Sequence, residues 1–458
     1  MMAMQLSEAA RVLAAQHIGE DVAFRGISTD TRKPLAGSLF FALQGPNYDA
    51  NEYVGTAHDQ GAAAAAVSRP CAVRLPQLQV PDTRLALGQL SAHWRNRFEL
   101  PVVAITGSNG KTTVRAMTSA ILSQCGQALS TQGNLNNDIG LPLTLARLDA
   151  DDRFAVIEMG ANHPGEIDYL AGLARPTIGV VTNAGPAHLE GFGDLPAVAR
   201  AKGELFARLG RDSVAIINAD DRYAPLWREL AAHCRIVEFG LHEGCDVTAS
   251  WSGDTAGSDL QLVTPQGNIE LRLPLPGRHN VMNALAATAA AQAAGAGLAE
   301  IKAGLESLAA VEGRFNTLQL PGPVSVIDDT YNANPASLQV ALDVLAQAAG
   351  ERWLVLGDMG ELGAESGELH RRAGDMARAA GVTRVYTLGE LACAALESFA
   401  GAGRACETLD ELLAALRADL TVPLHILVKG SRRMRMERVV QGLVATLSNS
   451  ETPSAENH

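Results

Sequence analysis

AITGSNGKTT, residues 104–113, is the stretch that decides the fold, because it follows a β-branched run with two glycines, a lysine and two threonines. A strand, a tight glycine turn and a helix in this order are typical of a phosphate-binding loop in an open α/β sheet. The standard spacing has a further glycine five residues before Gly110, where this chain has Ile105. The loop is therefore a shortened form, and the rest of the chain must indicate what its nucleotide is for.

The residues of this loop have distinct expected roles. Backbone N–H groups of the turn, with the N-terminus of the following helix behind them, form a cradle for an anion. Lys111 adds a positive charge for the β- and γ-phosphates, and Thr112 or Thr113 offers a hydroxyl to Mg²⁺. We therefore predict a nucleotide-binding segment made of Gly107, Ser108, Asn109, Gly110, Lys111, Thr112 and Thr113.

Composition limits the classes to which the chain can belong. Its 458 residues, 47% of them hydrophobic, exceed what a single core can bury, so we expect two to four domains. The net charge of −13, from 37 basic and 50 acidic residues, argues against a nucleic-acid partner. The N-terminus lacks a basic region followed by a long apolar run, so we expect a cytoplasmic monomer without membrane insertion.

Strand-like runs followed by helical patterns recur in the middle of the chain, which predicts parallel strands with crossover helices on both faces of a sheet. Alternating apolar residues on either side of a turn at 264–268 predict a hairpin in the same block. We expect residues 84–312 to form a central α/β domain, a P-loop ATPase-like and mostly parallel sheet with a small antiparallel annex. Its expected parallel strands are 102–106, 155–159, 179–183 and 214–218.

The same alternation starts again after residue 313, so residues 313–458 are predicted to form a second, C-terminal α/β domain with an open sheet. Before residue 84 the pattern is weaker, with two short strands and one helix, and residues 1–83 are predicted to form a small N-terminal α/β domain. The expected C-terminal strands are 324–328, 353–357, 385–389 and 424–428, with a helix at 337–349. The expected N-terminal elements are strands at 38–43 and 64–67 and a helix near 51–60.

Three side chains outside the loop have a functional and a structural interpretation. Glu158 ends a strand-like run, where a carboxylate can hold the magnesium of a nucleotide, although a Glu at a strand end is often structural. His188, in NAGPAHLEG, follows the next strand and is either a site residue or a surface or capping histidine. Lys202, in ARAKGELF, is by itself expected to be solvated.

Asn280 and Asn283 lie one helical turn apart in PGRHNVMNALAA and share a face. Such a pair can grip a base or a phosphate, or it can cap the helix.

The order of these motifs is similar to that of the Mur ligases, ATP-dependent enzymes that form amide bonds in peptidoglycan precursor synthesis. The resemblance covers nearly the whole chain through TGSNGKTT, EMGANHPGEI, NAGPAHLEGFG, AKGELF, LPGRHNVMNALAA, EGRF and DDTYNANPAS. The shortened phosphate loop is the form that this family uses. Within the family, four further motifs resemble those of the member that adds D-alanyl-D-alanine to UDP-N-acetylmuramoyl-tripeptide. They are GNLNNDIG, DDTYNANP, LGDMGELG and VKGSR.

The resemblance implies a three-domain enzyme and a two-step reaction. Residues 1–83 would bind the uridine nucleotide, residues 84–312 would bind ATP, and residues 313–458 would form a Rossmann-like domain that closes over both. ATP would convert the terminal carboxylate of the tripeptide into an acyl phosphate, which the amine of D-alanyl-D-alanine then attacks. The implied product is the UDP-MurNAc-pentapeptide.

The resemblance also implies roles for residues around ATP and two Mg²⁺ ions. Lys111 and Thr112 resemble the phosphate lysine and the magnesium threonine, while Glu158 and His188 resemble ligands of a second Mg²⁺. The matching residues on the adenine side are His279 and Asn280, and those that the C-terminal domain brings to ATP are Arg314 and Asp329.

Lys202 receives a different role from the resemblance than from its sequence context. In much of the family the matching lysine is carbamylated by CO₂ and becomes an anionic ligand of magnesium. The implied catalytic residues are then Lys111, Lys202 and His188. The base that accepts the proton of the attacking amine stays open among His188, Asp358 and Glu361.

Substrate contacts are implied for two groups of residues. The segment that resembles the uridine diphosphate site consists of Ser28, Thr29, Asp30, Thr31 and Arg32. Further substrate contacts are implied for Asn134, Asn137, Asp138, Asn332, Asn334, Asp358 and Lys429.

Two other functions compete with this interpretation. A folylpolyglutamate-synthetase-like ligase, or another Mur ligase step, would share the ATP-binding core, but the folate ligase lacks the uridine domain that residues 1–83 are expected to supply. A P-loop switch or motor would leave Glu158, Lys202 and Arg314 without a role.

Overall fold

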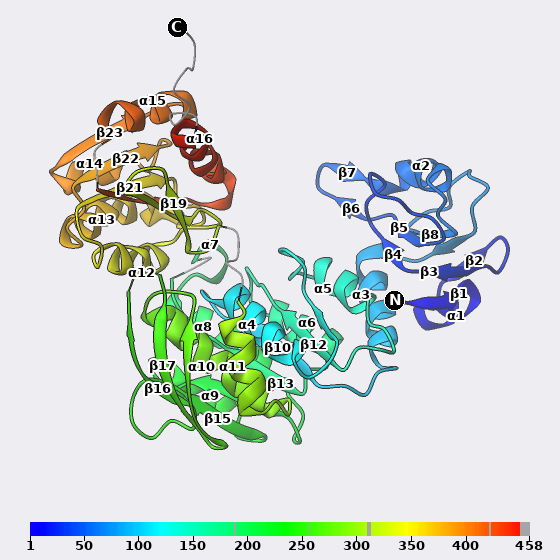
Figure 1. The fold of residues 1–458 in the computed structure, drawn as a ribbon. Helices are drawn as coiled ribbons and strands as arrows, with labels where there is room; N and C mark the ends of the chain where they lie inside the picture. Colours follow the sequence, from blue (N-terminus) through cyan, green and yellow to red (C-terminus); the bar gives the residue numbers. More distant parts are fainter. Residues whose placement is uncertain (187–188, 255, 309–312, 421–422, 449–458) are drawn as a thin grey trace, which may run out of the picture.

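A computed structural model describes the chain except residues 187–188, 255, 309–312, 421–422 and 449–458. Three α/β units follow one another along the chain. In the view of Figure 1 the C-terminal unit lies above the central one, and the N-terminal unit lies to its upper right. The predicted fold class is confirmed. None of the helices in the described ranges combines the length and apolar character that a membrane crossing requires.

The central unit is built on a six-stranded sheet in the order β11-β12-β10-β13-β14-β15, and all its pairs are parallel, as predicted. The strands are β10 (Val102–Thr106), β11 (Ala128–Ser130), β12 (Phe154–Glu158), β13 (Ile178–Val181), β14 (Val214–Asn218) and β15 (Arg235–Phe239). The helices are α3 (Thr83–Arg95), α4 (Lys111–Ser123), α5 (Gly140–Leu145), α6 (Glu166–Ala174), α7 (Leu189–Phe192), α8 (Leu195–Ala207), α9 (Ala224–Leu230), α10 (Arg278–Ala293) and α11 (Leu298–Glu306).

Alternate residues of β10 explain why both faces of this sheet are covered. Val102 and Ala104 pack into a core with α3, α5, α6 and α8, whereas Val103 and Ile105 pack into a second core with α4, α10 and α11. All five residues of the strand are buried. A strand buried on both faces reads as a continuous apolar run, which is the pattern that the sequence showed.

The predicted hairpin is present and carries a third strand. Strands β16 (Thr248–Gly253), β17 (Ser258–Thr264) and β18 (Gly267–Leu273) form an antiparallel sheet. Leu260, Leu262, Leu271 and Leu273 point from this sheet into the core beneath α10 and α11.

The C-terminal unit has a six-stranded sheet in the order β19-β20-β24-β21-β22-β23, parallel except for the β19 and β20 pair. Its strands are β19 (Asn316–Leu320), β20 (Val324–Asp329), β21 (Glu351–Gly357), β22 (Arg384–Leu388), β23 (Ala402–Cys406) and β24 (Leu424–Lys429). Its helices are α12 (Pro335–Leu345), η2 (Gly363–Glu365), α13 (Ser366–Ala379), α14 (Ala394–Phe399), α15 (Leu409–Asp419), η3 (Arg432–Met434) and α16 (Glu437–Ser448).

The N-terminal unit has more elements than predicted, because strands of two or three residues are too short for a periodic pattern. Its main sheet has the order β2-β9-β8-β5-β4, and β1 pairs with β3. The strands are β1 (Ala3–Gln5), β2 (Gln16–Ile18), β3 (Ala23–Arg25), β4 (Ile27–Ser28), β5 (Leu39–Phe41), β6 (Gln44–Gly45), β7 (Tyr48–Asp49), β8 (Ala64–Val67) and β9 (Gln77–Gln79). The helices are α1 (Leu6–Leu13), η1 (Ala50–Tyr53) and α2 (Val54–Asp59).

One core is shared by the N-terminal and central units. Met2, Leu6 and Leu13 belong to the same buried cluster as residues of α3, α5 and α6. The sheets are separate, but the packing crosses the predicted boundary at residue 83, and that boundary stays a prediction.

Candidate active site

A cavity of about 1190 Å³ opens where β10, β12 and β13 end, and the C-terminal unit forms its other wall. Ligands of open α/β sheets bind at this edge, because the carboxyl ends of the strands and the N-termini of the helices meet there. Predicted site residues that line it are Ser108, Asn109, Gly110, Lys111, Thr112, Thr113, Glu158, His279, Asn280, Arg314, Asp329, Asn134, Asn137, Asp138, Asn332, Asn334 and Lys429.

The phosphate loop has the backbone of an anion cradle. Gly107 and Gly110 have φ values of +145° and +83°, a region that glycine favours. A Cβ on Gly107 would lie 2.0 Å from Thr182 Oγ1, and a Cβ on Gly110 would lie 2.4 Å from Asn283 Oδ1. Both positions therefore require glycine, for conformation and for space.

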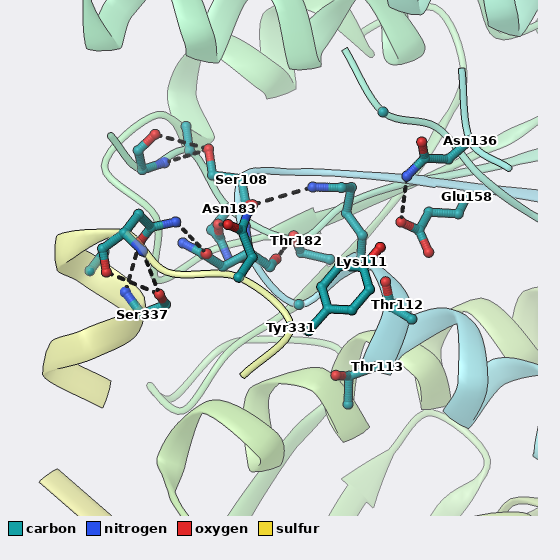
Figure 2. A pocket seen from close by; sticks show the side chains of 18 of the residues that line it. Ser108, Lys111, Thr112, Thr113, Asn136, Glu158, Thr182, Asn183, Tyr331 and Ser337 are labelled. Atoms are coloured by element: carbon teal, nitrogen blue, oxygen red, sulfur yellow. Dashed lines mark hydrogen bonds between the residues drawn. The ribbon is translucent and has the colours of Figure 1, made fainter. Parts of the chain in front are cut away.

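Side chains and backbone groups that follow β13 hold this loop. The Ser108 backbone N–H donates to Asn183 O at 3.0 Å, and the Asn109 N–H donates to Asn183 Oδ1 at 3.0 Å. Thr182 Oγ1 donates to Asn109 O at 2.6 Å. The loop is thus fixed by its neighbouring strand, as Figure 2 shows for Thr182 and Asn183.

Lys111 folds back over its own loop. Its Nζ donates to Gly107 O at 2.6 Å and to Ser108 O at 3.2 Å. Figure 2 shows the Lys111 side chain turned toward Ser108. Burial lowers the pKa of Lys111 from its usual value, whereas nearby Glu158 acts in the opposite direction. The lysine is thus held at the loop by two carbonyl groups.

Glu158 is the last residue of β12 and is only 2% exposed. Its Oε1 accepts a hydrogen bond from Asn136 Nδ2 at 2.9 Å, whereas Oε2 is buried and has no hydrogen-bond partner among the described residues. Arg115 Nε lies 3.4 Å from Oε2 without hydrogen-bond geometry. A buried carboxylate oxygen without a donor fits a site for a cation, which here faces the same cavity as Thr112.

Lys202 is not the solvated side chain that its sequence context predicted. It lies on a buried face of α8 and is only 1% exposed. Within the described residues its amine has no hydrogen bond or ion pair, and Nζ lies 5.3 Å from the centroid of the Phe192 ring. Burial, followed by the charge of Lys111, lowers the pKa of Lys202 to about 7. The neutral amine is therefore well populated near neutral pH.

His279 and Asn280 lie at the start of α10. Burial lowers the pKa of His279 to about 3, its Nε2 is buried without a partner among the described residues, and its ring lies 4.7 Å from that of Phe315. Asn280 Nδ2 donates to Pro276 O at 2.8 Å, and Asn283 Nδ2 donates to Asn280 Oδ1 at 3.3 Å. The two asparagines do share a face, and their amides stabilise the first turn of the helix.

The C-terminal wall of the cavity contributes three basic side chains, Arg314, Lys429 and Arg432. The Arg314 guanidinium stacks on the Tyr331 ring at 4.1 Å, and that of Arg432 lies 5.7 Å from the same ring. Lys429 is 1% exposed and forms an ion pair with Asp329. Asp329 therefore neutralises a buried lysine at the rim of the site.

Some predicted residues lie elsewhere or already have partners. Asp358 does not line the cavity, and its carboxylate accepts the backbone N–H groups of Leu391 and Ala392, which argues against substrate binding or base catalysis by this side chain. Asp138 does line the cavity, but its carboxylate already forms an ion pair with Arg84. His188 lies outside the described residues. The uridine segment lies in the N-terminal unit, away from the cavity, and its residues are Ser28, Thr29, Asp30, Thr31 and Arg32.

Four residues of the site have roles that the sequence did not indicate, namely Arg115, Asn136, Asn183 and Tyr331. Asn136, Asn183 and Tyr331 were inside recognised motifs, but a motif does not say which of its side chains support others. In the described part of the chain, no group of three or more His, Cys, Asp or Glu side chains is arranged to hold a metal.

Comparisons with known proteins show which family this chain is similar to. Residues 105–291 match the model of the Mur ligase middle domain, and residues 313–432 match that of the Mur ligase, glutamate ligase domain. The UDP-N-acetylmuramoyl-tripeptide–D-alanyl-D-alanine ligase of Escherichia coli (strain K12) is 46% identical over 448 residues, which cover 97% of this chain and 99% of the relative.

Solved structures show the same similarity. A crystal structure of MurF from Acinetobacter baumannii has a TM-score of 0.91 at 38% identity, with 97% of this chain and 99% of that one covered. MurF ligase from Thermotoga maritima, in complex with ADP, has a TM-score of 0.84 at 26% identity, with 93% and 98% covered. The resemblance inferred from the motifs is confirmed, and the chain belongs to the Mur ligase family.

Proposed function

We propose that this chain is an ATP-dependent ligase that joins D-alanyl-D-alanine to UDP-N-acetylmuramoyl-tripeptide. The observation that carries the proposal is 46% identity, over nearly the full length of both chains, to a ligase named for this reaction. The phosphate loop supports it, because it faces a cavity that the C-terminal unit closes. The ADP in the Thermotoga maritima relative supports nucleotide binding at this family's site.

The chemistry requires that a carboxylate become reactive toward an amine. The γ-phosphoryl group of ATP passes to the terminal carboxylate of the tripeptide, which forms a mixed anhydride and releases ADP. The amine of the dipeptide then attacks the acyl carbon, phosphate leaves, and a proton passes from the amine to a base. Both partners of the first step are anions, so positive charge must lie between them.

The phosphate loop and Lys111 supply part of that charge. The backbone N–H groups that start α4 would face a bound phosphate. Lys111 would then exchange its bonds to the carbonyl groups of Gly107 and Ser108 for bonds to phosphate oxygens. Arg314 stacks on Tyr331 at the opposite wall, from which it would contribute positive charge to a bound nucleotide. A water-excluding closure of this wall protects the acyl phosphate from hydrolysis.

Magnesium fits the residues at the edge of β12. Thr112 and Glu158 would hold one or two ions, together with His188 and a modified Lys202, and Glu158 Oε2 is the buried oxygen that has no donor in the described structure. When bound, Mg²⁺ supplies charge neutralisation on the phosphates. Asn136 keeps the carboxylate of Glu158 in place through Oε1.

We further propose that Lys202 carries a carbamate. Its amine is buried and has no hydrogen-bond or ion-pair partner among the described residues, so a charged ammonium is poorly stabilised there. Reaction of the neutral amine with CO₂ forms an N–C bond and releases one proton, which leaves an anionic oxygen pair. A Lys202→Ala variant should lose activity and regain part of it with added short carboxylates, and ¹³CO₂ should give a carbamate signal in the wild type alone.

The domain roles follow the same proposal. Residues 1–83 bind the uridine nucleotide through residues 28–32, residues 84–312 bind ATP, and residues 313–458 bring Arg314 and Asp329 to ATP and close over both. The separate sheets of the three units support this division. We also propose that the chain acts in the cytoplasm as a monomer.

A direct assay tests the proposal. Purified protein is incubated with ATP, Mg²⁺, D-alanyl-D-alanine and a UDP-muramoyl tripeptide that ends in either diaminopimelate or lysine, and the products are identified by mass. Formation of the pentapeptide, with ATP turnover that needs both other substrates, is the expected result. Brisk phosphate release with ATP alone, or extension of a folate instead, would count against this function.

A further inference from the structure

Asn334 joins the C-terminal unit to the phosphate loop. It is the N-cap residue of α12, and its Nδ2 donates a hydrogen bond to Asn109 Oδ1 at 3.0 Å. The two residues are 225 positions apart and belong to different sheets. Asn334 is buried, with 9% of the residue exposed, and it also borders the cavity. Its position is compatible with a structural role and with substrate binding, and its hydrogen bonds distinguish the two.

A helix cap fixes the orientation of the Asn334 amide. Asn334 Oδ1 accepts the backbone N–H of Ser337 at 2.8 Å, and Ser337 Oγ accepts the backbone N–H of Asn334 at 3.1 Å. This capping box uses the oxygen of the Asn334 amide. The nitrogen is therefore the atom that faces the loop.

Asn109 is equally well fixed on the other side of the bond. Its backbone N–H donates to Asn183 Oδ1, and its carbonyl group accepts Thr182 Oγ1 and Asn183 Nδ2. The backbone of Asn109 is thus bound to the strand edge, and its side chain reaches across to α12. Figure 2 shows Ser337 of α12 on the same side of the pocket as Asn183.

Residues just before Asn334 belong to the ATP side of the site. Asp329 ends β20 and pairs with Lys429, and Tyr331 supports the guanidinium of Arg314. The bond from Asn334 to Asn109 sets the distance between this segment and the phosphate loop. We propose that Asn334 is a positioning residue that seats the C-terminal unit on the phosphate loop through Asn109, and that it is not a substrate ligand.

The variant Asn334→Ser tests this role. Serine is an equally good N-cap residue, so α12 keeps its cap, but its hydroxyl is too short to reach Asn109. One neutral hydrogen bond changes an equilibrium by roughly threefold to tenfold. We expect the closed-to-open ratio to fall by about this factor, with a larger radius of gyration in small-angle X-ray scattering of the nucleotide-free protein and an unchanged melting temperature.

Ser337→Ala is the matched control for the helix cap. It removes the hydroxyl that accepts the Asn334 N–H, while its own backbone N–H still holds Asn334 Oδ1 and the bond to Asn109 remains. We expect a lower melting temperature and a wild-type scattering profile. Asn334→Ser with a wild-type profile, or Ser337→Ala with the larger radius, would overturn the proposal.

A double-mutant cycle with Asn109→Ala separates positioning from substrate contact. Asn109→Ala removes only the acceptor Oδ1, because the other bonds of Asn109 use its backbone. If Asn334 acts through Asn109, Asn334→Ser should lower kcat/KM for the dipeptide about threefold to tenfold in the wild type and have no further effect in Asn109→Ala. Independent effects that multiply would show that Asn334 contacts substrate and would overturn the proposal.

The cycle rests on the proposed ligase function, since it reads turnover, but the scattering experiment does not. A wild-type protein that makes no pentapeptide while Asn334→Ser still changes the scattering profile would defeat the proposed function and keep the positioning role. An active wild type together with an unchanged scattering profile in Asn334→Ser would keep the proposed function and overturn the positioning role.

Discussion

The substitution Gly107→Ala should damage the phosphate loop more than its small size implies. The new Cβ would lie 2.0 Å from Thr182 Oγ1, which is roughly 1.4 Å closer than the 3.4 Å at which ordinary contacts begin. Thr182 cannot turn away freely, because Oγ1 donates to Asn109 O at 2.6 Å and thereby holds the loop. Either the loop or this bond must give way.

The expected cost has two parts. The φ of +145° is unfavourable for alanine and costs about 1–2 kcal/mol, and overpacking against Thr182 costs about 1–3 kcal/mol. We therefore expect a loss of about 2–5 kcal/mol in local stability. Gly37→Ala is the matched control, because Gly37 also has a positive φ, +72°, but nothing lies within 4 Å of its added Cβ. It should cost about 1 kcal/mol.

Two measurements check this reasoning. Thermal denaturation should place the midpoint of Gly107→Ala below that of Gly37→Ala. Calorimetry should show ADP binding weakened by about tenfold or more in Gly107→Ala alone, because the expected loss exceeds the 1.4 kcal/mol that corresponds to a factor of ten in affinity. Adding Thr182→Ala should recover part of the loss, because it removes the nearest atom. Equal midpoints and equal ADP affinities for the two glycine variants would refute the steric argument.

Three further predictions concern buried charges. Glu158→Gln keeps an acceptor for Asn136 but loses a charge, so the Mg²⁺ concentration for half-maximal turnover should rise about tenfold or more; an unchanged Mg²⁺ titration would exclude Glu158 as a ligand. Lys202 has a folded pKa of about 7, below the 10.5 of the unfolded chain, so the unfolded state binds more protons between these values and stability rises with pH there. In CO₂-free buffer Lys202→Met should therefore be more stable than the wild type, and the difference should be greatest below pH 7, where it should reach a few kcal/mol in free energy of unfolding. Melting temperatures measured across pH check this. A stability difference that does not change with pH would contradict it. Asp329→Asn leaves buried Lys429 without its carboxylate and should cost about 3–5 kcal/mol of unfolding free energy, which Lys429→Met in the same chain should largely restore in thermal denaturation.

Elements with long periodic patterns could be predicted from the sequence, and side-chain partnerships could not. The strands around Val102, Val156 and Ile216 were predicted to within one or two residues, because each is a continuous apolar run between turn residues. The short strands of the N-terminal unit carried no such signal.

The candidate site shows the same division. A sheet edge brings together the ends of its strands, so Glu158 and the phosphate loop could be placed near each other from order alone. The burial of Lys202 could not be predicted, because ARAKGELF fits a solvated helix as well as a buried one. The groups near its amine, Phe192 of α7 and the charged Lys111 and Glu166, come from other segments. Likewise, the bond that Asp358 makes to the backbone beyond β22 depends on a neighbouring strand that the motif does not contain.

The core shared by the N-terminal and central units limits how this chain can be divided. Helix α1 packs on α3, and Met2 donates its backbone N–H to Ala146 O. A fragment that starts after residue 82 would remove Met2, Leu6 and Leu13 from the buried cluster that also contains Leu87, Leu90 and Leu145. An exchange of the N-terminal unit between related ligases should therefore include α3, because the packed core extends beyond the N-terminal sheet.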